Sequence, residues 1–318
     1  MADDHQHYVP QFLLKGFSTG GKRNKQVWVF DKRDDKSYRT SVRNVASQGG
    51  FYDFSIGNER RSLDPALQRL ESAVADDIRT VMQRKAMPSD QEARSRIAFF
   101  VAVQMVRTDA QRQQYIDLED LLRREIEKRG GWAEGAARFP DFSLEESTAQ
   151  AIQLIPHLAR SAAPFILSKS WILYATKASD PFWIGDNPVT LDNNINEAHI
   201  PGNLGLASEG IEICLPISDT LSMGFLCPSN EAMIRGAAKL AEQFGRSYSN
   251  IDSVRAMVRA LDGQEPYLFT AENVMRHNSL QVSYAERNVF SRDDNFSLVR
   301  EMIANNPENR SGPRFTVA

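Results

Sequence analysis

Residues 5–17 read HQHYVPQFLLKGF and combine two closely spaced histidines with a dense set of aromatic and aliphatic side chains. An apolar set of this kind, which extends from Tyr8 to Phe17, is expected to be buried. A chain end without such anchors frays in solution, whereas an anchored segment holds its polar side chains in place. We therefore expect residues 5–17 to be a structural element that positions a site beside it.

His5 and His7 are the first candidates for that site. In an extended segment, residues at positions i and i+2 lie on the same side, so the two imidazoles would face a common metal ion or phosphate group. His7 is the stronger candidate because it lies closer to the apolar anchor. The other histidines, His157, His199 and His277, have no second ligand at a recognisable spacing, so surface or satisfied interior roles are expected for them.

Residues 16–22, which read GFSTGGK, match two catalytic motifs in part. Gly16, Ser18 and Gly20 fit the pattern of an exposed serine nucleophile, which needs a strand before it and a helix after it. The residues that follow are too polar and basic to begin a packed helix. The same stretch nearly forms a phosphate-binding loop, but Arg23 stands where a Ser or Thr is required. We interpret it as a glycine turn.

Composition limits the class of protein. The 318 residues include 38 basic and 41 acidic side chains, so the net charge of -3 gives no strong positive field for indiscriminate nucleic-acid binding. The longest apolar run, 97–106, is about half of the roughly 18 residues of a membrane span. The acidic start does not resemble a signal peptide. We expect a soluble, cytoplasmic protein without a membrane partner, in which Cys214 and Cys227 are buried, reduced thiols.

The periodicity of the sequence predicts an α+β fold. Short N-terminal strands come first, then a long central helical region, then a mixed sheet with C-terminal helices. We expect one domain, 1–318, with a subdivision into a sheet-rich part (1–60 plus 165–318) and a helical part (61–164) as the alternative. The expected strands are 27–31, 38–42, 171–174, 182–184, 211–215, 221–226 and 288–291.

The helices expected are 62–88, 89–129, 144–163, 231–244 and 271–285. Ser89 and Glu92 predict a capping box at the start of the second helix, and a break or bend is expected near Thr108. Pro156 is expected to interrupt the third helix.

Arg107 follows a helical segment that is apolar nearly all round, and Gln104 lies on the same face. A buried guanidinium without a partner is very costly, so either a carboxylate or an anionic ligand must meet it. Both alternatives stay open from the sequence. Asp186 and Asn187 end an apolar strand at a Pro, either as catalytic or metal-binding groups or as an Asx-turn. Asn278 and Gln281 share one face of a late helix, where they would bind a ligand or neighbouring main chain.

The chain resembles a widespread, largely bacterial family catalogued as domain of unknown function 4238. The resemblance is most specific at residues 5–17 and continues weakly to about Phe290, through Phe51-Tyr52, Leu70-Glu71, Gln104-x-x-Arg107, the Trp171 strand, Gly185-Asp186-Asn187-Pro188 and the helix with Asn278. It implies that the whole chain is one unit and that His7, Arg107 and Asp186 belong to a recurrent pattern. The family has no established activity to transfer.

Our first hypothesis is a hydrolase that acts on a phosphate-containing substrate, a nucleotide or nucleic acid. In it, His5 or His7 is the general base or a metal ligand, Asp186 binds a divalent metal ion or orients the base, and Arg107 stabilises negative charge. The alternative is a non-catalytic protein that binds an anionic ligand through Arg107, Gln104, Asn187 and Asn278. A third hypothesis is an interaction subunit of a bacterial defence or toxin-like module. Oligomeric state is left open.

Overall fold

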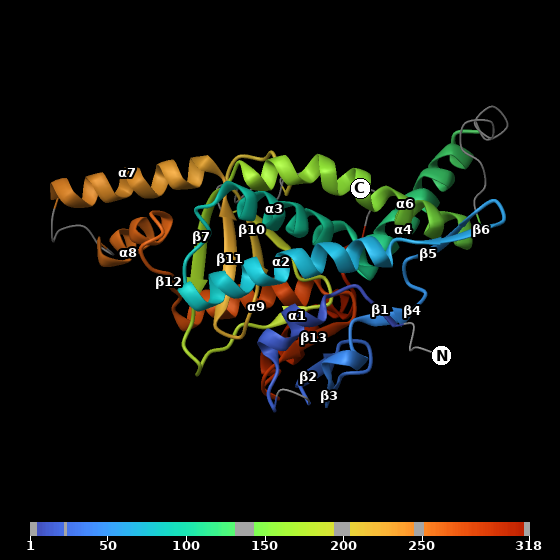
Figure 1. The fold of residues 1–318 in the computed structure, drawn as a ribbon, viewed down its shortest axis with the longest axis horizontal. Helices are drawn as coiled ribbons and strands as arrows, with labels where there is room; N and C mark the ends of the chain where they lie inside the picture. The colour runs from blue at the N-terminus through green and yellow to red at the C-terminus, as the bar shows by residue number, and fades with distance from the viewer. Residues whose placement is uncertain (1–4, 22–23, 131–142, 194–203, 245–250, 315–318) are drawn as a thin grey trace.

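Two larger β-sheets surrounded by helices form the framework of the protein, which is described from a computed structural model (Figure 1). The structure describes residues 5–21, 24–130, 143–193, 204–244 and 251–314. Strands and helices come in runs along the chain, so the predicted α+β class is confirmed. His199, for which a surface or interior role was expected, and the predicted loop residues Lys22 and Arg23 lie outside the described residues.

The larger sheet has five strands in the order β12-β7-β11-β10-β9. Its pairs are antiparallel except for β12 and β7, which are parallel. The predicted pairing of the two strands β10 and β11 is confirmed. In sheet order, the strands are β12 (Tyr267–Leu268), β7 (Ser170–Ala175), β11 (Leu221–Leu226), β10 (Ile211–Pro216) and β9 (Thr190–Asn193).

The second sheet is antiparallel and joins the two ends of the chain, in the order β3-β2-β13-β8. Its strands are β3 (Lys36–Ser41), β2 (Gln26–Asp31), β13 (Asn288–Ser291) and β8 (Ile184–Gly185). The hairpin of β2 and β3 is as predicted. Because β13 lies between β2 and β8, this sheet brings residues from both ends of the chain together.

Two small ribbons flank the sheets. The N-terminal histidine segment is β1 (His5–His7), which pairs antiparallel with β4 (Ser47–Gly49). The second ribbon pairs β5 (Asp53–Ile56) with β6 (Glu59–Ser62).

The helices surround the five-stranded sheet, with α3 against one face and α9 against the other (Figure 1). The guanidinium of Arg94 lies 4.3 Å from the ring centroid of Trp171, which fixes α3 against β7. None of the described helices is long and apolar enough to cross a membrane. The helices are α1 (Gln11–Leu14), α2 (Asp64–Arg84), α3 (Gln91–Val106), α4 (Asp109–Lys128), α6 (Leu144–Leu167), α7 (Pro228–Phe244), α8 (Ile251–Leu261), α9 (Ala271–Tyr284) and α10 (Ser297–Asn305).

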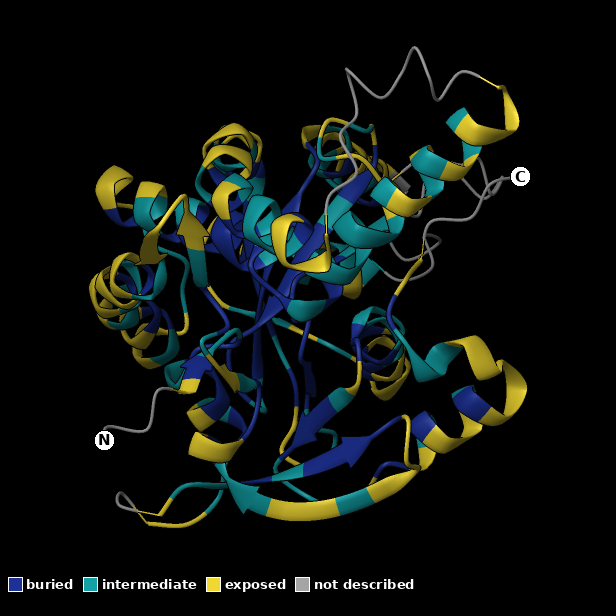
Figure 2. Cartoon of the chain, turned by 90° about the vertical axis from the view of Figure 1, so that its right-hand side faces the viewer, coloured by how far each residue is buried: buried dark blue, intermediate teal, exposed yellow. Residues whose placement is uncertain are grey.

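The distribution of buried and exposed residues follows this arrangement of sheets and helices. Figure 2 shows buried residues in the central strands and on the helix faces turned toward them, and exposed residues on the outer helix faces. Val9, Leu13 and Phe17 are fully buried, which confirms that residues 5–17 are anchored. Cys214 and Cys227 are buried, free thiols, as predicted.

Three local predictions need correction. The N-cap of α3 is Asp90, whose carboxylate accepts the Ala93 amide, so Ser89 does not cap it. Helix α6 continues through Pro156, because Ile152, Ile155 and Ala159 pack into the core and offset the lost backbone hydrogen bond.

The strand predicted at 182–184 shrinks to the two residues of β8. The physical reason is that the amide of Trp183 donates to the Asn278 side chain, at 2.9 Å, and takes no part in a strand ladder. The predicted break near Thr108 is confirmed, since Thr108 is the N-cap residue between α3 and α4.

Gly16 lies where the N-terminal segment meets the turn between β10 and β11. The Asp219 amide donates to the Gly16 carbonyl at 3.1 Å, and a Cβ at Gly16 would lie 2.4 Å from the Ile217 carbonyl oxygen. We therefore expect Gly16→Ala to lower the free energy of unfolding by about 1–3 kcal/mol, because main chain must move to admit the methyl group. Urea denaturation would measure this loss. Gly21→Ala is the matched control, since nothing lies within 4 Å of its Cβ position. Equal stability of the two variants would contradict the prediction.

Candidate functional site

Arg107 is buried, and its guanidinium is hydrogen-bonded to groups of the protein. It is the C-cap residue of α3, and its side chain is 1% exposed. Its Nη1 donates to Oε1 of Glu71 at 2.7 Å, and its Nε donates to the Tyr52 hydroxyl at 2.9 Å. Its Nη2 donates to the main-chain oxygen of His7. Of the two alternatives left open by the sequence, the carboxylate is the one that the structure contains.

The same network fixes the middle of the histidine segment. The side chain of Gln6 is buried between β1 and the start of β5, where its Oε1 accepts the Tyr52 amide and its Nε2 donates to Asp53 at 2.8 Å. The Tyr52 hydroxyl also donates to the Arg107 carbonyl, at 3.1 Å. Segments far apart in the sequence are thus locked together behind the two histidines.

A cavity of about 380 Å³ lies between the histidine segment and α2. We call it the His5–His7 cavity. It is lined by both histidines, by the carboxylates Asp64 and Glu71, and by Gln11, Phe12, Gln68, Ser72 and Ala75. The N-terminal segment thus contributes the imidazoles and α2 contributes the acidic groups, one of which is the partner of Arg107.

Burial shifts the pKa values of His7 and Glu71 in opposite directions. It lowers the pKa of His7 below its usual 6.5, an effect that the Arg107 charge reinforces and main-chain groups of Arg43 and Val42 oppose. Burial raises the pKa of Glu71 above its usual 4.5, against the opposing effect of Arg107. Nε2 of His7 is buried, and the described residues offer it no hydrogen-bond partner. The pKa of the His7 imidazole in this cavity is thus lowered, and the pKa of the Glu71 carboxyl is raised.

The Asp186 side chain binds main-chain amide groups. Its carboxylate accepts the amides of Glu286, Arg287 and Asn288 at 2.6, 2.9 and 2.7 Å and is 2% exposed. Burial raises its pKa to about 6, although the three amides and Lys32 oppose that shift. Asp186 does not line the His5–His7 cavity.

The candidate ligand-binding amides are also used within the protein. Gln104 donates to the Tyr8 carbonyl at 2.8 Å, and Asn187 accepts the Thr108 hydroxyl at 3.0 Å. Asn278 accepts the Trp183 amide and donates to the Pro181 carbonyl, while Gln281 binds the main chain at Gly185 and Pro188. The second of the two roles considered for the α9 amides, binding of neighbouring main chain, is therefore the one observed.

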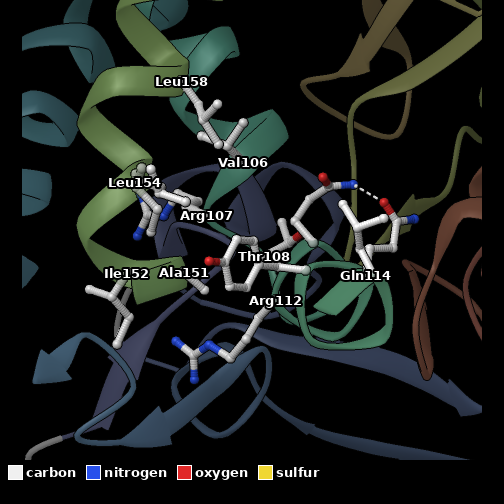
Figure 3. Close-up of a pocket in the computed structure, with 13 residues that line it drawn as sticks. Val106, Arg107, Thr108, Arg112, Gln114, Ala151, Ile152, Leu154 and Leu158 are labelled. Atoms are coloured by element: carbon white, nitrogen blue, oxygen red, sulfur yellow. Dashed lines mark hydrogen bonds between the residues drawn. The ribbon is translucent and has the colours of Figure 1, made fainter. Parts of the chain in front are cut away.

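Arg107 also borders a second, smaller cavity of about 170 Å³ between α4 and α6 (Figure 3). Its lining is mainly aliphatic, with Val106, Ile152, Leu154 and Leu158 among its residues. The guanidinium of Arg112 is already stacked 3.5 Å from the ring centroid of Phe51. This cavity is therefore a weaker candidate for a catalytic site.

The structure does not bring the predicted metal ligands His5, His7 and Asp186 to one cavity, because the Asp186 oxygens are taken up by residues 286–288. Within the described part of the chain, no group of three or more His, Cys, Asp or Glu side chains could hold a metal ion. The His5–His7 cavity instead pairs the histidines with Glu71, which was not predicted as a site residue. The signal for it is a carboxylate on the apolar stripe of α2, between Leu67 and Val74.

The fold and this site define an α+β protein in which a buried Arg-Glu-Tyr network lies behind a histidine-lined cavity. Residues 5–295 match the family model described as a protein of unknown function, DUF4238, and the chain belongs to this family. Neither a curated protein nor a solved structure matches the chain.

Proposed function

We propose that the protein is a hydrolase-type enzyme whose acid–base centre is the His5–His7 cavity. The observation that supports this function is that His7, whose pKa is lowered by burial, lines the same cavity as the Glu71 carboxylate. An imidazole that is neutral at neutral pH is a typical general base of hydrolytic sites. Arg107 is then a positioning residue, which holds Glu71 at the cavity wall and does not contact the substrate.

The substrate in this proposal carries a phosphate group. A volume of about 380 Å³ suits a nucleotide better than a long nucleic acid. Water would attack phosphorus while Nε2 of His7 accepts its proton, and the leaving oxygen would keep the electron pair of its broken bond to phosphorus and take a proton from solvent. Because the charge of Arg107 is matched by Glu71, we expect the phosphate to enter with a divalent cation.

The test is turnover of nucleoside mono-, di- and triphosphates with and without Mg²⁺ or Mn²⁺, measured as release of inorganic phosphate in the cytoplasmic pH range. We expect His7→Ala to lose about 10²–10⁴-fold in turnover, the usual contribution of a general base. The wild-type rate should fall on acidification below pH 6.5, because a His7 with a lowered pKa is protonated only there.

His157→Ala is the matched control, since His157 is exposed on α6. Full turnover by His7→Ala would contradict the proposal. Binding of a nucleotide by both wild type and His7→Ala, without turnover by either, would replace it with the non-catalytic alternative.

A further inference from the structure

A third cavity, of about 200 Å³, lies between α9 and the five-stranded sheet, on the opposite side of the sheet from α3. We call it the α9 cavity. Its walls include the aromatic rings of Tyr174, Tyr267 and Phe269, and its polar residues include Glu212, Cys214 and His277. None of these residues belongs to the His5–His7 cavity or to the network behind it.

Glu212 lines this cavity, and its two carboxyl oxygens differ in their partners. Its Oε1 accepts hydrogen bonds from the Tyr174 hydroxyl and from the Cys214 thiol, the latter at 3.6 Å. Within the described residues, Oε2 has no hydrogen-bond partner. Burial raises the pKa of Glu212, so the group has more acid character than an exposed glutamate.

A glycine in the middle of β11 makes this geometry possible. The ring of Tyr174 lies over Gly224, and a Cβ at that position would be 2.4 Å from Cε2 of the ring. The tyrosine on β7 can therefore lie across β11 and reach Glu212 on β10. A glycine inside a strand commonly marks such a close approach.

Two further lining residues have buried polar atoms without a partner among the described residues: Nδ1 of His277 and Oγ1 of Thr190. The other ring nitrogen of His277 is 2.9 Å from the Ser222 hydroxyl. Buried polar atoms are nearly always hydrogen-bonded, so these two indicate a missing partner at the cavity.

His277 and the pair of Arg276 with Asp192 add little net charge to the cavity. Burial lowers the pKa of His277 to about 4, so its ring is neutral at neutral pH. Arg276 and Asp192, which also line the cavity, pair with each other at 2.7 Å. Aromatic walls favour a flat partner, and the rings of Tyr174 and Phe269 pack against each other at a tilt of 34°, with their centroids 4.5 Å apart.

We propose that the α9 cavity is a binding site for a neutral, flat heteroaromatic molecule about the size of a nucleobase. The aromatic rings contact its faces, while Glu212 Oε2 and the polar groups of Thr190 and His277 bind its edge. The small volume excludes larger ligands, since sites for drug-sized molecules begin at about 300 Å³. This site is independent of the proposed acid–base centre.

Isothermal titration calorimetry of the whole chain tests the proposal, with adenine as the probe and benzoate as a flat but anionic control. We expect adenine to bind and benzoate to bind at least tenfold more weakly. Glu212→Gln should weaken adenine binding about tenfold, because it changes the donor and acceptor pattern at one hydrogen bond. Glu209→Gln, at an exposed carboxylate nearby, should leave it unchanged.

Tyr174→Phe removes only the hydroxyl that holds Glu212, so it tests the same geometry with little risk to folding. This variant should also weaken the binding of adenine. His7→Ala should bind adenine as the wild type does, which separates this site from the His5–His7 cavity. Absence of adenine binding at millimolar concentration, tighter binding of benzoate, or equal affinities of Glu212→Gln and Glu209→Gln would each overturn the proposal.

Discussion

Replacement of Arg107 by methionine is expected to lower the free energy of unfolding by about 3–5 kcal/mol, the usual cost of removing one partner of a buried ion pair. The variant leaves the Glu71 carboxylate without its counter-ion, and it leaves the Tyr52 hydroxyl and the His7 carbonyl without their donor. Methionine fills much of the same volume, so the loss would report the hydrogen bonds and charge, with little contribution from a cavity.

Urea denaturation followed by circular dichroism measures this loss. Arg79→Met is the matched control, because Arg79 forms an exposed pair with Asp76 on α2, and its change should stay within about 0.5 kcal/mol. The double variant Arg107→Met, Glu71→Leu should regain part of the stability, since it removes the uncompensated carboxylate as well. Equal losses for Arg107→Met and Arg79→Met would contradict the role assigned to the network.

Asp186→Ala is expected to destabilise the protein by about 3–5 kcal/mol, because three main-chain amides lose their acceptor in a buried position. The loss should be accompanied by faster hydrogen exchange at Glu286, Arg287 and Asn288, measured by NMR or mass spectrometry. Asp76→Ala, at an exposed carboxylate of α2, should show neither effect.

This expectation also bears on assays of function. A loss of turnover in an Asp186 variant would follow from unfolding, so it would not identify Asp186 as catalytic. Unchanged stability of Asp186→Ala, combined with lost turnover, would instead restore the direct role that the sequence suggested.

The longer helices and the local hairpins could be predicted because their signals are local, whereas α8 and α10 were not predicted. Leu67, Val74, Ile78 and Val81 recur at helical spacing and are the buried face of α2. Strands without an apolar pattern escaped prediction, and β6, which is exposed throughout, is one of them. The pairing of β2 with β13 also escaped, because alternation shows that a strand has a buried face without showing which distant strand covers its edge.

The candidate site, like the fold, could be predicted only in part. Two histidines in an extended segment share a side, and both line one cavity, as their spacing indicated. The partner of Arg107 lies 36 residues away on another helix, so the sequence could state only that some anion was needed. For Asp186, a carboxylate that binds main chain and one that faces a ligand have the same local sequence. Glu212 lacked an obvious signal beyond a charge in an apolar strand.

The place of β13 between β2 and β8 has a consequence for biosynthesis. Synthesis proceeds from the N-terminus, so the hairpin of β2 and β3 leaves the ribosome long before residues 288–291 exist. Until then the inner edge of β2, with its unpaired main-chain groups, is open to wrong partners. Nascent chains of this protein therefore depend on late completion of the four-stranded sheet, and a translational pause before β13 would prolong their exposure to chaperones and to aggregation.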